Sequence, residues 1–407
     1  MNIPVAERLA PIQEYYFSQK LREIDGLNRA GARVINLGIG SPDLPPHPSV
    51  VQALTAAALR PDTHAYQSYR GVPALRQAVA DWYRRSYGVT LDPEAEVLPL
   101  LGSKEGIVHV CMTFLQPGDE ALIPNPGYPT YRAAVQLSGA APVDYDLTAA
   151  NGWLPDLAAL ARRDLSRVKL MWLNYPHMPT GARASAAALE KLVAFARQHG
   201  ILLVHDNPYS FILNDEPLSL LAVPGAREVA LELNSLSKSH NMAGWRVGLL
   251  AGRADLLQQV LRFKSNMDSG MFLPVQLAAA AALHLGPEWS AGLNATYRAR
   301  REQVFELLDA LGCAYDRTQV GLFVWARVPA AYADGYALSD AVLSRARVFI
   351  TPGGIFGSNG NGFVRLSLCQ PTAVLTEAQQ RLAEAGWPVA RASARVLPDT
   401  AVADSLS

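Results

Sequence analysis

Residues 235–248, with the sequence SLSKSHNMAGWRVG, lie between two apolar runs of strand length. The hydroxyls of Ser235 and Ser237 and the guanidinium of Arg246 are groups that bind phosphate, and the planar fork of an arginine suits two oxygens of one dianion. Lys238 would lie beside that phosphate. A desolvated lysine near another cation has a lowered pKa, so its neutral amine can condense with an aldehyde.

A carboxylate follows another apolar run, at residues 201–206 (ILLVHD). Ligands of open α/β sheets bind beyond the carboxyl ends of the strands, which places Asp206 for function. A carboxylate there can keep a pyridinium nitrogen protonated, and Tyr209 could hydrogen-bond a phenolic oxygen of the same ring. One helix and one strand fit between Asp206 and Lys238, so both side chains can reach one ligand.

Strand-length apolar runs alternate with helical patterns along much of the chain. This alternation predicts an α/β fold whose large domain has a mostly parallel central sheet covered by helices on both faces. The expected strands are residues 97–101, 120–123, 168–173, 201–205, 229–233 and 247–251.

The pattern changes after about Gly292, where residues 297–311 predict a long charged helix and residues 322–328 and 363–368 predict short strands. We expect a smaller α+β domain here, which a helix around residues 14–27 joins. The predicted domains are residues 46–290 (large, cofactor-binding), residues 1–45 with 291–390 (small, discontinuous) and a mobile tail at 391–407.

The composition favours a globular chain that acts on small molecules. Half of the 407 residues are apolar, and 36 Lys plus Arg balance 36 Asp plus Glu. The zero net charge gives no large field that would attract nucleic acid or anionic lipid. Three dispersed cysteines suit a reducing compartment, and the first twenty residues lack a secretory signal, so we expect a cytoplasmic protein. The apolar residues 272–285 are too few to cross a bilayer.

The lysine stretch has the form S-x-S-K-x5-G-x-R-x-G, and residues 35–368 as a whole resemble the fold-type I, pyridoxal-phosphate-dependent aminotransferases of classes I and II. The resemblance implies a homodimer that transfers an amino group from an amino acid to a 2-oxo acid by a ping-pong route. Lys238 would hold pyridoxal 5'-phosphate as a Schiff base and then act as base and acid in turn. Asp206 would stabilise the negative charge drawn into the ring.

Two further segments carry cofactor-binding residues by this resemblance. Residues 102–106 (GSKEG) precede an apolar helix whose backbone N–H groups can bind phosphate, which implicates Ser103 and Lys104. Tyr128 in residues 125–131 (NPGYPTY) would stack on the pyridine face.

The resemblance also extends beyond one chain. Tyr66 resembles the tyrosine that reaches the phosphate of the neighbouring subunit, which implies a dimer with shared active sites.

An arginine within an apolar strand is costly unless an anion pairs with it, and Arg365 in residues 363–368 (FVRLSL) is such a residue. The family uses this arginine to hold the substrate α-carboxylate, and the backbone of a loop that includes Gly40 approaches the same group. Residues 264–270 (KSNMDSG) resemble the diaminopimelate-type branch. Arg262 fits the position that binds a second substrate carboxylate only with a shifted register.

Met178 departs from the family pattern, which has asparagine immediately before Pro-Thr-Gly. That asparagine donates a hydrogen bond to the phenolic oxygen of the cofactor, and methionine cannot. We hypothesise that Tyr209 makes this interaction alone and that the Schiff base keeps its proton to a higher pH than in relatives with asparagine.

Other readings stay open at this level. Arg365 could form a structural ion pair, and Tyr128, Ser103 and Tyr66 could have local roles. The same cofactor motifs also occur in lyases and synthases of the β-elimination or cyclopropane-forming type. A cofactor-sensing regulator would need an added DNA-binding domain with a basic face, and the first thirty residues are too few and too mixed in charge for one. No spacing of histidine or cysteine predicts a metal site.

Overall fold

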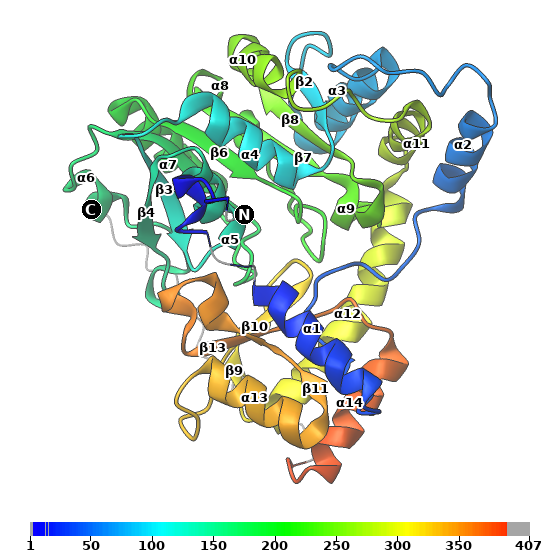
Figure 1. Cartoon of the computed structure of the whole chain (residues 1–407), viewed down its shortest axis with the longest axis vertical. Helices are drawn as coiled ribbons and strands as arrows, with labels where there is room; N and C mark the ends of the chain where they lie inside the picture. Colours follow the sequence, from blue (N-terminus) through cyan, green and yellow to red (C-terminus); the bar gives the residue numbers. More distant parts are fainter. Residues whose placement is uncertain (1–2, 13, 15, 389–407) are drawn as a thin grey trace.

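The computed structural model describes residues 3–12, 14 and 16–388, and its largest sheet has seven strands (Figure 1). The strand order is β2-β8-β7-β6-β5-β3-β4, and only β8 runs against its neighbours. This confirms the predicted mostly parallel α/β sheet. The strands are β2 (Val97–Leu100), β3 (Glu120–Asn125), β4 (Ala141–Asp146), β5 (Val168–Leu173), β6 (Leu202–Asp206), β7 (Ala230–Ser235) and β8 (Gly248–Gly252).

Helices cover both faces of this sheet, because successive side chains of its buried strands enter two different apolar cores. Leu231 and Leu233 of β7 pack in the core of α4, α5 and α10, whereas Ala230 packs in the core of α3, α7 and α11. The helices of this part are α2 (Pro48–Ala58), α3 (Pro73–Tyr87), α4 (Ser103–Phe114), α5 (Pro129–Leu137), α6 (Leu157–Ala161), α7 (Ala186–His199), α8 (Ala226–Val229), α9 (Leu236–Ser239), α10 (Ala254–Lys264) and α11 (Leu273–Leu283).

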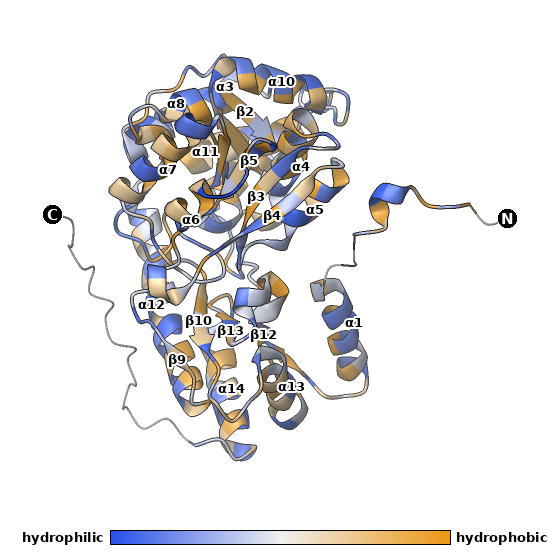
Figure 2. Cartoon of the chain, turned by 90° about the vertical axis from the view of Figure 1, so that its left-hand side faces the viewer, coloured by the Kyte–Doolittle hydropathy of each residue, from blue (hydrophilic) through white to orange (hydrophobic). Residues whose placement is uncertain are grey.

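A smaller antiparallel sheet, of order β12-β13-β10-β9, lies beside the first, and a two-stranded parallel pair joins β1 to β11 (Figures 1 and 2). Ile24 of α1 packs with Leu343 and Phe349, so the N-terminal helix lies against this part. The elements are α1 (Tyr16–Arg29), β1 (Ile35–Asn36), α12 (Pro287–Ala310), β9 (Ala314–Tyr315), β10 (Phe323–Arg327), α13 (Gly335–Ala346), β11 (Val348–Phe349), β12 (Thr351–Pro352), β13 (Phe363–Ser367) and α14 (Thr372–Glu384).

Helix α12 begins at Pro287, ten residues before the expected start at Tyr297. Its first turns lack the charged pattern that marked the later ones, and Pro287 at the first helical position favours the earlier start. The predicted boundary between residues 290 and 291 therefore falls inside one continuous helix. The division into domains stays a prediction, and the tail at 391–407 lies outside the described residues.

Parallel pairing of β6 with β7 fixes where polar side chains leave the sheet. Asp206 is opposite Leu233, and β7 ends two residues later at Ser235. Both strand ends therefore open at the same edge of the sheet. Among the described residues, no helix is long and apolar enough to span a membrane.

Candidate active site

A cavity of about 460 Å³ opens at this edge of the sheet. It brings together residues that are far apart in sequence and were singled out there for cofactor or substrate binding. Those that line it are Gly40, Ser103, Lys104, Tyr128, Asp206, Tyr209, Ser235, Ser237, Lys238, Arg246 and Arg365. Tyr66 does not line it, and 91% of its surface is exposed.

The turn between β7 and α9 presents the lysine. Ser235 caps α9, and its Oγ accepts a hydrogen bond from Ser237 N at 3.1 Å. Lys238 Nζ donates to the Gly40 carbonyl oxygen at 2.5 Å. Burial lowers the pKa of Lys238, and the nearby Arg365 and Arg246 lower it further. The amine is therefore biased towards its neutral, nucleophilic form.

The start of α4 forms a cradle for an anion. Its N-cap is Gly102, and no side chain caps the free backbone N–H groups of the first turn. A Cβ atom at Gly102 would lie 2.1 Å from Arg246 Nη2, and one at Gly248 would lie 2.5 Å from Ser103 N. Glycine at position 102 therefore leaves room for the Arg246 guanidinium at the helix start, and glycine at position 248 lets the backbone of β8 approach the same turn. Burial and the charge of Arg246 lower the pKa of Lys104.

Asp206 is a buried carboxylate with one oxygen bound and one unbound. Its Oδ2 accepts a hydrogen bond from the Tyr131 hydroxyl at 2.8 Å, and its Oδ1 is buried without a hydrogen-bond partner among the described residues. Burial raises the pKa of Asp206 to about 6, although the Tyr131 hydroxyl partly offsets this. A buried acceptor without a donor is costly, so Oδ1 is suited to a cationic ligand group.

Arg365 of β13 forms the wall opposite the sheet. Its Nη2 donates to the Gly38 carbonyl oxygen at 2.7 Å, and its guanidinium carbon lies 3.8 Å from the centre of the Phe323 ring and 4.7 Å from that of Phe356. The charged group is held between aromatic faces in a buried setting. A Cβ atom at Gly40 would lie 2.1 Å from Phe323, so glycine is needed at that position.

Met178 lies in the cavity, where its Sδ accepts a hydrogen bond from Arg365 Nη1 at 3.2 Å. Its backbone N–H donates to Asn174 Oδ1 at 2.8 Å, and Asn174 Nδ2 donates to the backbone oxygen of Asp206 at 2.6 Å. The amide of Asn174 is thus engaged with backbone groups. Tyr209 also lines the cavity, and burial raises the pKa of its hydroxyl, which keeps that hydroxyl a donor.

The sequence reasoning missed several cavity residues. Asn174 directly follows β5, so it could have been found in the same way as Asp206, because ligands bind beyond the carboxyl ends of the strands. Tyr131, which lies three residues after Tyr128, was also missed. Phe17 and Leu21 of α1 carry no local signal, because they reach the cavity only through the tertiary fold.

A larger cavity, of about 970 Å³, lies elsewhere and is lined by none of the predicted site residues. Its buried histidine, His205, already interacts with Glu232 Oε2 at 2.9 Å and with the Tyr175 carbonyl oxygen at 2.9 Å. The smaller cavity contains the reactive groups and is therefore the candidate active site.

Comparisons with known proteins agree with this arrangement. The family model "Aminotransferase class I and II" matches residues 32–382. LL-diaminopimelate aminotransferase of Desulforudis audaxviator is 44% identical over 384 residues, which cover 94% of this chain and 98% of that protein. The corresponding protein of Moorella thermoacetica is 42% identical, with coverage of 93% and 97%.

Solved structures show the same architecture. Substrate-bound BacF from Bacillus subtilis superposes with a TM-score of 0.90 at 38% identity, covering 97% of this chain and all of that one. An aspartate aminotransferase variant from Thermus thermophilus gives a TM-score of 0.87 at 27% identity, with coverage of 94% and 100%.

The raised pKa of Asp206 predicts a pH-dependent effect of Asp206→Asn on the cofactor-free protein. The unfolded carboxyl loses its proton near pH 3.8 and the folded one near 6, so this group lowers stability as pH rises between those values. The free energy of unfolding of Asp206→Asn should equal that of the wild type near pH 4 and should be higher by roughly 3 kcal/mol at about pH 7.5.

Denaturant unfolding of both apoproteins at several pH values measures this difference. The exposed Asp215→Asn provides the matched control and should show no such trend. If the difference in unfolding free energy between Asp206→Asn and the wild type stays constant from pH 4 to 7.5, the pKa of Asp206 is not raised in the folded protein.

Proposed function

The chain belongs to the class I and II aminotransferases, and we propose that Lys238, Asp206 and Arg365 are the residues with which it carries out the reaction of that family. It is a pyridoxal-phosphate-dependent transaminase that moves an amino group from an amino acid to a 2-oxo acid. The observation that carries the residue assignment is the buried, unbound Oδ1 of Asp206 in the same cavity as the amine of Lys238.

The residues present fit the cofactor. The uncapped start of α4, with Ser103, Lys104 and Arg246, suits its dianionic phosphate. Asp206 Oδ1 suits a protonated ring nitrogen, and Tyr128, whose ring meets Tyr131 edge to face at 5.6 Å, offers an aromatic face. When bound, pyridoxal phosphate supplies an aldehyde and an electron-withdrawing ring.

Lys238 has two roles in this proposal. Its neutral amine would hold the cofactor by condensing with the aldehyde, with loss of water, and once the substrate amine has taken its place the freed lysine would accept the proton from substrate Cα. The same amine would then donate that proton to the former aldehyde carbon. The lowered pKa supports both roles, because an ammonium group could neither attack nor accept a proton.

Arg365 would bind the α-carboxylate of the substrate. Two carboxylate oxygens match the fork of a guanidinium, and Phe323 and Phe356 exclude water from that pair and so strengthen it. We propose an L-α-amino acid as donor. Because relatives are named LL-diaminopimelate aminotransferase, LL-diaminopimelate is the first donor to test.

We also propose a cytoplasmic homodimer. Tyr66 is far more exposed than an aromatic side chain usually is, which suits a residue that reaches the active site of a second copy. The three cysteines are buried free thiols, which suits a reducing compartment.

Single-turnover assays with amino donor alone test the proposed function. We expect about one equivalent of 2-oxo acid per site and loss of the visible absorbance that the Schiff base between cofactor and lysine gives. Arg365→Lys should lower kcat/KM about 100-fold, mainly through KM, because a bidentate contact is lost. Arg327→Lys, on an exposed position of β10, is the control.

Repeated release of ammonia and 2-oxo acid without an acceptor would indicate a lyase instead. An unchanged KM in Arg365→Lys would remove Arg365 from carboxylate binding.

Met178→Asn tests the departure from the family pattern. The new amide can donate to the phenolic oxygen of the cofactor and so stabilises its anion, which favours loss of the neighbouring proton. The pH midpoint of the visible absorbance of the holoenzyme should therefore fall relative to wild type. The exposed Met267→Asn should leave it in place. Coincident titration curves for wild type and Met178→Asn would refute the hypothesis.

A further inference from the structure

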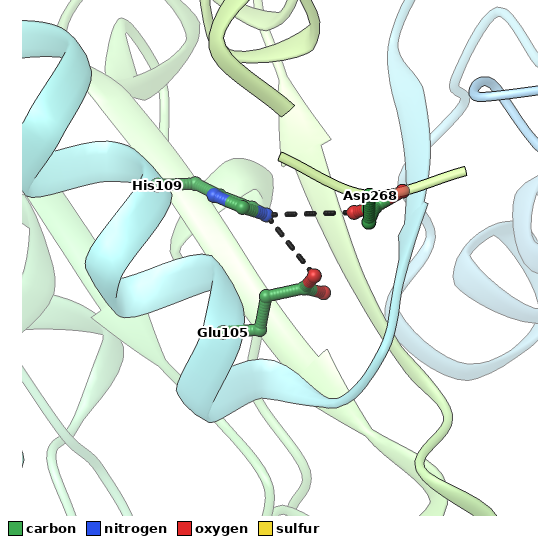
Figure 3. A group of neighbouring side chains, drawn as sticks. All are labelled: Glu105, His109 and Asp268. Atoms are coloured by element: carbon green, nitrogen blue, oxygen red, sulfur yellow. Dashed lines mark ion pairs between the residues drawn. The ribbon is translucent and has the colours of Figure 1, made fainter. Parts of the chain in front are cut away.

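Glu105 and Asp268 form a cluster with the buried His109 (Figure 3), and none of the three lines the active-site cavity. Glu105 and His109 lie one turn apart on α4, and Asp268 belongs to the loop that follows α10. Their nitrogen and oxygen ligand atoms all lie within 4.8 Å of one another. The side chain of His109 is completely buried and that of Asp268 is 8% exposed.

Each carboxylate in the cluster has one oxygen occupied and one directed at the histidine. Glu105 Oε2 accepts a hydrogen bond from Leu101 N at 2.6 Å. Asp268 Oδ1 accepts from Lys264 Nζ at 2.6 Å and from Gly270 N at 3.0 Å. The other two oxygens, Glu105 Oε1 and Asp268 Oδ2, lie 3.2 and 3.8 Å from His109 Nε2.

These facing atoms do not satisfy one another. Both ring nitrogens of His109 and Asp268 Oδ2 are buried without a hydrogen-bond partner in the part of the chain that the structure describes. A separation of 3.8 Å is too long for a direct hydrogen bond. It is also short for a bridging water, whose two bonds of about 2.8 Å usually span more than 4 Å.

A metal ion fits the same separations. For metal–ligand bonds of about 2.1 Å, the separations of 3.2 and 3.8 Å between His109 Nε2 and the two oxygens correspond to ligand–metal–ligand angles of roughly 100° and 130°, which a distorted tetrahedral site accommodates. One imidazole and two carboxylates are ligands that zinc and related divalent ions accept.

The charges of the cluster also call for a cation. Lys264, itself buried, balances one of the two carboxylates. The hydrogen bonds from that lysine and from Gly270 N both go to Asp268 Oδ1, so Oδ2 of the same carboxylate stays available.

We propose that Glu105 Oε1, His109 Nε2 and Asp268 Oδ2 bind a divalent metal ion of the zinc class. The ion joins the first turns of α4 to the loop after α10. Glu105 also accepts a hydrogen bond from Leu101 N, two residues before Ser103, where the phosphate cradle begins. An ion bound to Glu105 would therefore also restrain this part of the chain. The role is structural, since none of the three ligands lines the active-site cavity.

Metal binding by the purified holoenzyme tests the proposal. The protein is freed of metal by dialysis against a chelator and then given Zn²⁺, or Co²⁺ as a spectroscopic probe. About one equivalent per chain should remain after gel filtration, measured by elemental analysis, and Tm should rise by about 5 °C. Co²⁺ should show ligand-field absorption bands of low-symmetry N/O coordination.

Matched variants assign the ion to this cluster rather than to the cofactor or to surface histidines. His109→Gln and Asp268→Asn should each lose the retained equivalent and the Tm rise, while the exposed His64→Gln keeps both. Asp268→Asn keeps an oxygen for Lys264, so it preserves most of the local packing.

Retention of less than about 0.1 equivalent by the wild type would overturn the proposal, whatever the variants do. Full retention by a folded His109→Gln would overturn it as well. In either case the three side chains pack together without a metal ion. The transaminase assignment does not depend on this outcome, because activity with amino donors is measured separately.

Discussion

The site depends on the burial of an acid and an amine in one cavity. Desolvation opposes charge on both groups, so it raises the pKa of Asp206 and lowers that of Lys238. In the proposed function, this suits Asp206 to accept a hydrogen bond from a cationic ring nitrogen and Lys238 to act as the nucleophile. The same physical effect therefore prepares two unlike groups for one ligand.

Parallel strands create this arrangement. Because β6 and β7 run in the same direction, Asp206 and the turn that carries Lys238 leave the sheet at one edge. Arg365 comes from the second sheet and closes the cavity from the other side. The buried Glu232 on β7, which holds His205 of β6 and the Leu220 N–H, fixes the two strands to each other just behind the site.

The sequence predicted the parts of this structure that have strong local signals. Buried central strands are continuous apolar runs, and all six expected runs became strands. Strand β4 was missed because it is an edge strand in which only Tyr145 is buried. The start of α12 was missed because its first turns carry no charged pattern.

For the site, residues that end strands or interrupt apolar runs, such as Asp206 and Arg365, could be found from sequence. Tyr131, which supports Asp206, and Phe17 on α1 could not, because their places follow from tertiary packing. The cluster of Glu105, His109 and Asp268 was also missed, since its third member lies far along the chain and only the fold brings it to α4.

Chemical trapping of the attachment site tests the central claim most directly. Borohydride reduction of the holoenzyme fixes the bond between cofactor and protein, and peptide mass spectrometry then locates the modified lysine. The account predicts the pyridoxyl phosphate adduct on Lys238 alone. An adduct on Lys104 or another lysine, with Lys238 unmodified, would contradict it.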